Sequence, residues 1–328
     1  MMRTRRFAVL AAVFLLTSGL ALGAQYAPAP VTTFTLPPSV KFPEGIAFST
    51  ATQMFYTADA ENGTVVEISR KGDATRIVAG PGVVAPVGTT TFPAALGMKV
   101  DAANRLWIAG GRTGRMSVLD VKTGKLIRQV ASPTAGSLIN DVAIAGNAAY
   151  FTDTRNPTLW RLAAEGPRIG DLQPWISFAD TPIQYDGGNN LNGITLTPDG
   201  QYLIVVQMDK GLLFRIEIAS QAIRAINTTG IDLSGGDGLV MIGDVLYVVR
   251  QPAGEIVALQ IQPDPLLAKV ITRFRDPALA WPATAVAVEN SLVVANSQFN
   301  ARATKAAREP FSFAFVPLSR LTAPPSQR

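Results

Sequence analysis

The sequence contains no cysteine and no histidine. The absence of cysteine excludes disulfide bonds, iron–sulfur clusters, thiol catalysis and a lipid-modified N-terminal cysteine. The absence of histidine excludes a Ser-His-Asp triad and any zinc or haem site with an imidazole ligand. Catalysis or metal binding must therefore use carboxylates, carboxamides, lysine, arginine, tyrosine, serine or threonine. These groups favour hard cations bound through oxygen, such as Ca²⁺ or Mg²⁺.

Charged residues are also scarce. They make up 16% of the 328 residues, and the formal net charge of +5 comes from scattered lysines and arginines. Because no basic stripe is interleaved with aromatic residues, we expect no nucleic-acid partner. A hydrophobic content of 48% and a mean hydropathy of +0.22 exclude disorder for the bulk of the chain. We expect a folded protein that acts on a small-molecule substrate or ligand.

Long apolar runs are absent except near the N-terminus. Residues 1–24 begin with three arginines, continue with an apolar run over residues 7–16 and end with small residues. This is the layout of a cleaved secretory signal peptide, and the run is short for a membrane span. The Arg5-Arg6 pair suggests a twin-arginine signal as the alternative, but Phe7 follows without a spacer, which favours general secretion. We expect a periplasmic or secreted protein with no membrane span in the mature chain.

A strand–turn–strand unit recurs along the chain. In its clearest copy, residues 191–206, an alternating strand leads through Pro198-Asp199-Gly200 into an apolar strand that starts at Tyr202. The copies begin at residues 44, 96, 140, 192, 237 and 284, with a mean spacing of 48 residues. Six units of this length, each with three recognisable strands and room for a fourth, are typical of a β-propeller.

The predicted fold is therefore all-β, a six-bladed β-propeller of four-stranded antiparallel blades. We expect one domain over residues 25–320 and a flexible tail over residues 321–328. The strand-like lead-in at residues 31–36 is expected to complete the last blade, and residues 167–190 are expected to form an extended loop. A pair of β-sandwiches would not explain the repeat. A seventh blade would have to fit into residues 25–40, which are too few.

The first residue of each copy is the candidate functional position. The first strand of a propeller blade is innermost, so these residues should form a ring at one mouth of the central channel. They are Glu44, Leu96, Asn140, Asn192, Asp237 and Thr284. Two carboxylates and two carboxamides offer oxygen ligands and a charge of −2 to one divalent cation. We expect Ca²⁺, with Mg²⁺, Mn²⁺ or Zn²⁺ as alternatives. The competing interpretation is that Asn-Gly and Asp-Gly are only turn signals.

A second ring is expected just outside the first, because the second strand of each blade returns to the same face. The residues that follow this strand are Asp59, Arg112, Asp153, Gln207, Arg250 and Asn296. Among residues in this region, Arg112, Arg155, Arg250 and Gln207 are the candidates for binding an anionic or polyhydroxylated substrate. The competing interpretation is that they are ordinary polar residues of surface loops.

Four motifs give the chain a resemblance to the SMP-30/gluconolactonase/LRE-like, or regucalcin-type, six-bladed propellers. They are Pro43-Glu44-Gly45, Ile139-Asn140-Asp141, Leu191-Asn192-Gly193-Ile194 and Gly236-Asp237-Gly238. The resemblance implies that Glu44, Asn192 and Asp237 ligate one divalent metal and that Asn140 is a fourth ligand or a substrate contact. It also makes Asp237 the candidate general base, with Asp141 and Asp153 as the alternatives. The chain departs from the pattern at Leu138, where hydrolytic members carry a substrate-binding arginine.

The resemblance implies an exported, divalent-metal-dependent hydrolase that opens a sugar lactone or related ester with a metal-activated water. A bound cation can polarise a carbonyl group and acidify water, which suits a chain without histidine. The alternative function is a non-catalytic propeller that binds a ligand or serves as a scaffold and has a structural metal site.

Overall fold

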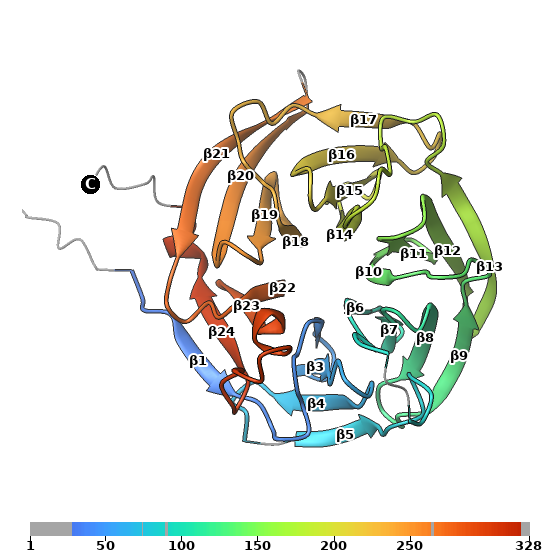
Figure 1. Cartoon of the computed structure of the whole chain (residues 1–328), viewed down its shortest axis with the longest axis vertical. Helices are drawn as coiled ribbons and strands as arrows, with labels where there is room; N and C mark the ends of the chain where they lie inside the picture. The colour runs from blue at the N-terminus through green and yellow to red at the C-terminus, as the bar shows by residue number, and fades with distance from the viewer. Residues whose placement is uncertain (1–27, 74, 89–90, 264–265, 323–328) are drawn as a thin grey trace, which may run out of the picture.

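In the computed structural model, residues 28–73, 75–88, 91–263 and 266–322 can be described. They form six four-stranded antiparallel sheets arranged as the blades of a propeller (Figure 1). The predicted fold is confirmed. The helices among the described residues are two short 3₁₀ turns, η1 (Phe299–Ala301) and η2 (Leu318–Arg320). Within the same residues, no helix has the length and apolar character needed to cross a lipid bilayer.

Each of the first five blades is built from four consecutive strands. Blade 1 contains β2 (Ile46–Ser49), β3 (Met54–Ala58), β4 (Val65–Ser69) and β5 (Thr75–Ala79). Blade 2 contains β6 (Met98–Val100), β7 (Arg105–Ala109), β8 (Arg115–Asp120) and β9 (Leu126–Ala131). Blade 3 contains β10 (Ile139–Ala145), β11 (Ala148–Asp153), β12 (Thr158–Glu165) and β13 (Arg168–Ser177). Blade 4 contains β14 (Leu191–Leu196), β15 (Tyr202–Gln207), β16 (Leu212–Glu217) and β17 (Ile223–Ile226). Blade 5 contains β18 (Gly236–Ile242), β19 (Val245–Arg250), β20 (Glu255–Pro263) and β21 (Leu266–Arg275).

The sixth blade closes the circle with a strand from the start of the chain. It contains β22 (Pro282–Val288), β23 (Ser291–Asn296) and β24 (Ser312–Pro317), and its outermost strand is β1 (Thr32–Thr35). Phe34 pairs with Phe313 in register, and their ring centroids lie 5.3 Å apart. The expected use of the lead-in strand is confirmed. This pairing ties the two ends of the propeller together without a covalent bond.

The core is divided among the contacts between neighbouring blades. Among the described residues, six clusters of buried apolar side chains occur, and each joins two adjacent blades around the ring. The alternation of side chains along each strand explains this, because successive residues face opposite neighbours. The inner strands β6, β10, β14, β18 and β22 lie nearest the central axis (Figure 1). Their N-terminal ends therefore meet at the channel.

The inner strands of four blades share one irregularity. The pairing register shifts between Ile139 and Val142, and at the equivalent steps of β14, β18 and β22. Two residues of each strand lie within this step. In β22 they are Ala283 and Thr284, so the residue equivalent to Asn140 is Ala283. The expected sixth ring member, Thr284, is therefore one position too late, and its hydroxyl donates to the Glu44 carbonyl oxygen.

The outer parts of the chain differ from expectation in two places. The expected loop over residues 167–190 contains β13, an edge strand that tolerates Pro174 because its outer side needs no backbone donor. The tail expected from residue 321 begins with a fully buried residue, since Leu321 packs with Phe274 and Val316 between blades 5 and 6. The predicted signal peptide lies outside the described residues.

Candidate functional site

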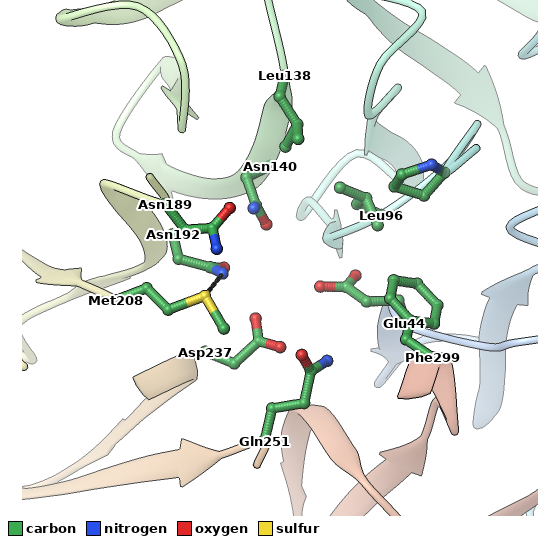
Figure 2. A pocket seen from close by; sticks show the side chains of 11 residues that line it. Glu44, Leu96, Leu138, Asn140, Asn189, Asn192, Met208, Asp237, Gln251 and Phe299 are labelled. Carbon is green, nitrogen blue, oxygen red and sulfur yellow. Dashed lines mark hydrogen bonds between the residues drawn. The ribbon is translucent and has the colours of Figure 1, made fainter. Parts of the chain in front are cut away.

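Side chains from four blades converge at one mouth of the channel (Figure 2). Glu44 precedes β2, whereas Asn140, Asn192 and Asp237 are the second residues of β10, β14 and β18. All four line one cavity of about 150 Å³. We call the six equivalent positions the mouth ring: Glu44, Leu96, Asn140, Asn192, Asp237 and Ala283. The structure thus brings together all four side chains predicted to bind a cation.

The polar members of the mouth ring are buried, yet each has an oxygen without a hydrogen-bond partner. Their exposed fractions are 3% for Glu44, 6% for Asn140, 5% for Asn192 and 2% for Asp237. The unpartnered atoms are Glu44 Oε2, Asn140 Oδ1, Asn192 Oδ1 and Asp237 Oδ1. Because buried polar atoms nearly always have partners, such a group indicates a missing ligand.

The amide nitrogens of Asn140 and Asn192 each have a hydrogen-bond partner. Asn140 Nδ2 donates to Thr154 Oγ1 at 2.8 Å, and Asn192 Nδ2 donates to Met208 Sδ at 3.2 Å. Asn140 Oδ1 and Asn192 Oδ1 have no hydrogen-bond partner, and both side chains extend into the cavity that the two carboxylates also enter (Figure 2). This orientation presents four hard oxygen donors to one point, which is the chemistry that Ca²⁺ or Mg²⁺ requires.

The carboxylates repel one another in this setting. Burial raises the pKa of Glu44 well above its usual value of 4.5, and the charges of Asp237 and Asp141 raise it further while Lys99 opposes them. Burial and the Asp141 charge likewise raise the pKa of Asp237 well above 3.8. A dication at the ring would relieve this repulsion. The described residues hold no cluster of three or more His, Cys, Asp or Glu able to bind a metal, so the site depends on the carboxamides.

The glycines that follow the ring residues are needed for close approach of the inner strands. A side chain at Gly193 would collide with the Asp237 carbonyl oxygen, and one at Gly45 would collide with the Leu96 carbonyl oxygen. Gly193 and Gly238 lie inside strands rather than in hairpin turns. The turn interpretation of Asn-Gly and Asp-Gly is therefore wrong.

Asp141 occupies the glycine position in blade 3. Its carboxylate accepts hydrogen bonds from Val142 N at 2.8 Å and Ile194 N at 3.1 Å, which connects β10 to β14. Thr152 Oγ1 adds a bond of 2.7 Å to the Asn192 carbonyl oxygen. These contacts fix the spacing between Asn140 and Asn192.

The expected second ring has a different role. Residues that end the second strand of each blade, or lie at the equivalent position, form what we call the anchor ring: Asp59, Gly110, Asp153, Gln207, Arg250 and Asn296. The register places Gly110 there instead of Arg112. The polar members are buried and bind local backbone: Asp153 Oδ1, for example, accepts from the amides of Leu138, Arg155 and Asn156.

None of the four predicted substrate-binding residues lines the cavity. Arg112 and Arg155 are exposed on the turns that follow β7 and β11. The Arg250 guanidinium pairs with Glu255 at 2.6 Å and Asp232 at 2.7 Å. Gln207 Nε2 donates to Gln184 O at 2.7 Å and Asn190 Oδ1 at 3.0 Å, although Gln207 Oε1 has no partner.

Several cavity residues were not anticipated as site residues from the sequence. They are Pro93, Asn189, Met208, Gln251 and Phe299, together with Leu138. Met208 and Gln251 directly follow the anchor-ring residues Gln207 and Arg250. Successive residues of an extended chain face opposite sides. The side chain that reaches the cavity therefore belongs to the residue after the anchor-ring position, and not to the anchor-ring residue itself. Phe299 and Asn189 come from long loops, whose paths the sequence does not specify.

Comparison with known proteins supports the fold. Residues 23–149 match the model of the SMP-30/Gluconolactonase/LRE-like region family, which confirms the resemblance over that part. No curated protein sequence matches the chain. A gluconolactonase from Xanthomonas campestris is 16% identical over 88% of this chain and 89% of its own, with a TM-score of 0.60.

Two further solved structures share the architecture. The calcium-binding protein regucalcin from Agrobacterium tumefaciens is 15% identical over 88% of this chain and 92% of its own, with a TM-score of 0.62. Virginiamycin B lyase from Staphylococcus aureus is 14% identical over 88% of this chain and 99% of its own, with a TM-score of 0.57. For that lyase, a variant with alanine in place of a histidine is described as catalytically inactive. At these identities, the likeness is one of fold.

Proposed function

We propose that this protein is a divalent-cation-dependent hydrolase that opens a lactone or related ester. The observation that carries the proposal is the convergence of four buried, unpartnered oxygens at the channel mouth. The family match and the gluconolactonase fold neighbour support the reaction class. The calcium-binding fold neighbour supports Ca²⁺ as the first cation to test, before Mg²⁺, Mn²⁺ and Zn²⁺.

Glu44, Asn140, Asn192 and Asp237 would hold the cation. Ca²⁺ takes six to eight oxygen ligands, so these four donors would leave ligands to be supplied by water or substrate. When bound, a divalent cation polarises a carbonyl oxygen and lowers the pKa of water. The carboxylates of Glu44 and Asp237 would balance the charge of the cation.

The remaining chemistry belongs to the protein's own side chains. Asp237 is buried beside the cavity, and its carboxylate could hold the cation through one oxygen and accept a proton from an attacking water through the other. Asn189 and Gln251 line the same side and can orient polar groups of a substrate. Leu96 and Leu138 line the opposite side and exclude water from it. The absence of histidine argues against chemistry like that of the lyase, whose histidine variant is inactive.

Turnover of lactones tests the proposal. We would follow acid release in a pH-stat with a panel of sugar and alkyl lactones, each with Ca²⁺, Mg²⁺, Mn²⁺ or Zn²⁺ added in turn. We expect cation-dependent hydrolysis that Asp237→Ala lowers by about a hundredfold or more in kcat/KM, because it removes both a ligand and the base. Arg155→Ala, an exposed residue outside the cavity, is the control and should retain the full rate.

A non-catalytic binding protein is the second candidate function. It is favoured by the two apolar members of the mouth ring, Leu96 and Ala283, and by the lack of arginine and lysine among the described residues that line the cavity. If no lactone is hydrolysed while added cation raises the melting temperature, the binding function replaces the enzymatic one.

We also propose that the protein is exported to the periplasm or secreted after cleavage near residue 23 or 24. The support is the arginine-rich, then apolar, then small-residue order of the N-terminal segment. N-terminal sequencing of protein recovered from the periplasmic fraction or medium should give a chain that begins near residue 24 or 25. Recovery of uncleaved protein from the cytoplasm would contradict export.

A further inference from the structure

The cavity has two chemically different walls. Figure 2 shows Leu138, Leu96 and Phe299 from the top to the right of the cavity, with the Glu44 carboxylate between Leu96 and Phe299. Asn189, Asn192 and Met208 lie at the left, and Gln251 lies at the bottom. Pro93 also lines the cavity, and a side chain at Gly111 would contact both the Pro93 carbonyl and Leu96, so these two residues are neighbours. We call Pro93, Leu96, Leu138 and Phe299 the apolar arc.

The apolar arc is held firmly in place. The Leu138 amide donates to Asp153 Oδ1 at 3.1 Å, and the Leu96 amide donates to the Ala109 carbonyl oxygen at 2.8 Å. The Pro93 carbonyl oxygen accepts from the Arg112 amide at 2.9 Å. These bonds fix three members of the arc through the backbone, so the apolar surface is preformed.

The fourth member of the arc, Phe299, is secured by aromatic packing. Its ring lies 4.8 Å from Phe92 and 6.5 Å from Phe42 between centroids. Arg302 covers the Phe92 ring at 4.0 Å and pairs with Glu61 at 3.3 Å. The β23–β24 loop, which carries Phe299 on η1, is thereby fastened to blade 1.

The charges of the cavity lining disfavour anionic ligands. Glu44 and Asp237 are the charged side chains that line the cavity, and neither lysine nor arginine is among the described lining residues. The position at which an arginine was expected from the resemblance holds Leu138, which is 7% exposed. A carboxylate or phosphate on the substrate would lose water against leucine and phenylalanine without gaining a cationic partner from the protein.

We propose that the cavity selects neutral lactones or esters with an apolar carbon skeleton over anionic or polyhydroxylated ones, and that Leu138 and Phe299 determine this preference. The proposal rests on the proposed function, since it names the substrate class of the same site. The carbonyl group faces the mouth-ring oxygens and their cation, and the alkyl or aryl group packs on the apolar arc. Asn189 and Gln251 accommodate the ring oxygen or a single hydroxyl group. Each further hydroxyl on the apolar side would be buried without a partner.

A substrate-by-variant comparison tests this preference. We would measure kcat/KM with CaCl₂ for three five-membered lactones: one with an alkyl chain, one with hydroxyl groups and one with a carboxylate. The variants are Leu138→Arg and Phe299→Ala, with Leu212→Ser as the matched control because Leu212 is an exposed leucine outside the cavity. Comparing substrate ratios between variants cancels the intrinsic reactivity of each lactone.

We expect the wild type to prefer the alkyl lactone by about tenfold or more, a typical discrimination for an apolar pocket. Leu138→Arg should reduce that preference about tenfold and favour the carboxylate lactone, Phe299→Ala should reduce it less, and Leu212→Ser should leave it unchanged. Equal or better turnover of the hydroxylated lactone by the wild type would overturn the proposal. So would unchanged substrate ratios in folded Leu138→Arg and Phe299→Ala.

A binding measurement separates this proposal from the proposed reaction. Cyclic ketones have no scissile ester bond, so calorimetry with an alkyl cyclopentanone and a hydroxylated cyclopentanone reports selection without chemistry. Tighter binding of the alkyl ketone, weakened by Leu138→Arg, would support the preference even if no lactone is hydrolysed. Equal binding of the two ketones would contradict it even in an active enzyme.

Discussion

The mouth ring and the anchor ring use similar side chains at neighbouring positions of the same repeated hairpin, but their hydrogen bonding differs. In the anchor ring, every side-chain polar atom except Gln207 Oε1 has a partner, as with Asp59, which accepts from three backbone amides. In the mouth ring, each polar member retains a buried oxygen without one. Burial is common to both rings, so burial does not distinguish structural from functional residues here.

The comparison indicates how the fold separates stability from function. The anchor ring joins each second strand to the loop beside it, so its side chains complete the backbone hydrogen bonding of the propeller. The mouth ring lies one layer closer to the axis, where the inner strands of the blades present side chains to a shared space. Experiments that remove members of each ring should therefore affect different properties.

The largest effect is expected in the anchor ring at Arg250. Arg250→Ala should lower the free energy of unfolding by about 3 kcal/mol, because the buried Glu255 loses its closest partner and keeps only the more exposed Arg273 and Arg275. The bonds from Arg250 to Asp232 and to the Ser234 carbonyl oxygen are lost as well. Urea unfolding measures this change. Arg155→Ala, an exposed arginine, should change stability by less than about 0.5 kcal/mol. Equal effects of the two substitutions would contradict the structural role of the anchor ring.

Stabilisation of the protein by a bound cation should depend on the mouth ring and not on the anchor ring. At a free Ca²⁺ concentration of about one hundred times Kd, the wild type should gain about 2.7 kcal/mol of stability. Chelation should reverse this gain, and Asp237→Ala should abolish it, whereas Asp59→Asn should retain it on a less stable background. Thermal unfolding with and without EDTA checks the prediction. A melting temperature that responds neither to chelator nor to any added divalent cation would remove the basis for the metal site.

The mouth-ring carboxylates should make the free energy of unfolding depend on pH. In chelated protein the folded-state pKa values of Glu44 and Asp237 are raised, so their protonation favours folding at low pH. This contribution is fully present below the unfolded values of about 4.5 and 3.8, and it is lost as pH rises through the folded values.

The matching experiment compares the wild type with the double variant Glu44→Gln and Asp237→Asn in EDTA. The stability advantage of the double variant should grow as pH rises, by at most about 1.4 kcal/mol per pH unit for each proton. Added Ca²⁺ should remove the trend for the wild type at neutral pH. A difference that stays constant between pH 4 and pH 8 would show that the two carboxylates titrate normally.

The smallest effects should have opposite signs in the two rings. In chelated protein, Asp237→Asn should raise stability by about 1 kcal/mol, since it removes a buried charge beside Glu44. Asp153→Asn should lower it by about 1 kcal/mol, because the new amide group would face the Asn156 Nδ2 donor that now lies 3.1 Å from Asp153 Oδ2. Chemical denaturation in EDTA at pH 7 compares the two variants. Changes of the same sign would erase the distinction between the rings.

Much of the fold could be predicted from the sequence, because strand periodicity and turn chemistry are local. The spacing of the repeats predicts six blades, and Glu44, Asn140, Asn192 and Asp237 could be placed together because equivalent positions superpose around an axis. Errors of one or two residues occurred where register depends on pairing with another strand. The sequence predicted Thr284 in the mouth ring and Arg112 in the anchor ring, whereas the strand pairing places Ala283 and Gly110 there.

The sequence by itself determined the number of blades, the closing strand and the four oxygen donors, since each follows from a repeated local pattern. Tertiary structure alone decided which polar side chains are left without partners. Arg250 is a plausible substrate contact until Glu255 and Asp232 are seen beside it. The apolar arc is likewise invisible in the sequence, because its members come from separate loops and strands. Whether a polar group is free depends on all its neighbours, and those neighbours are distant in the chain.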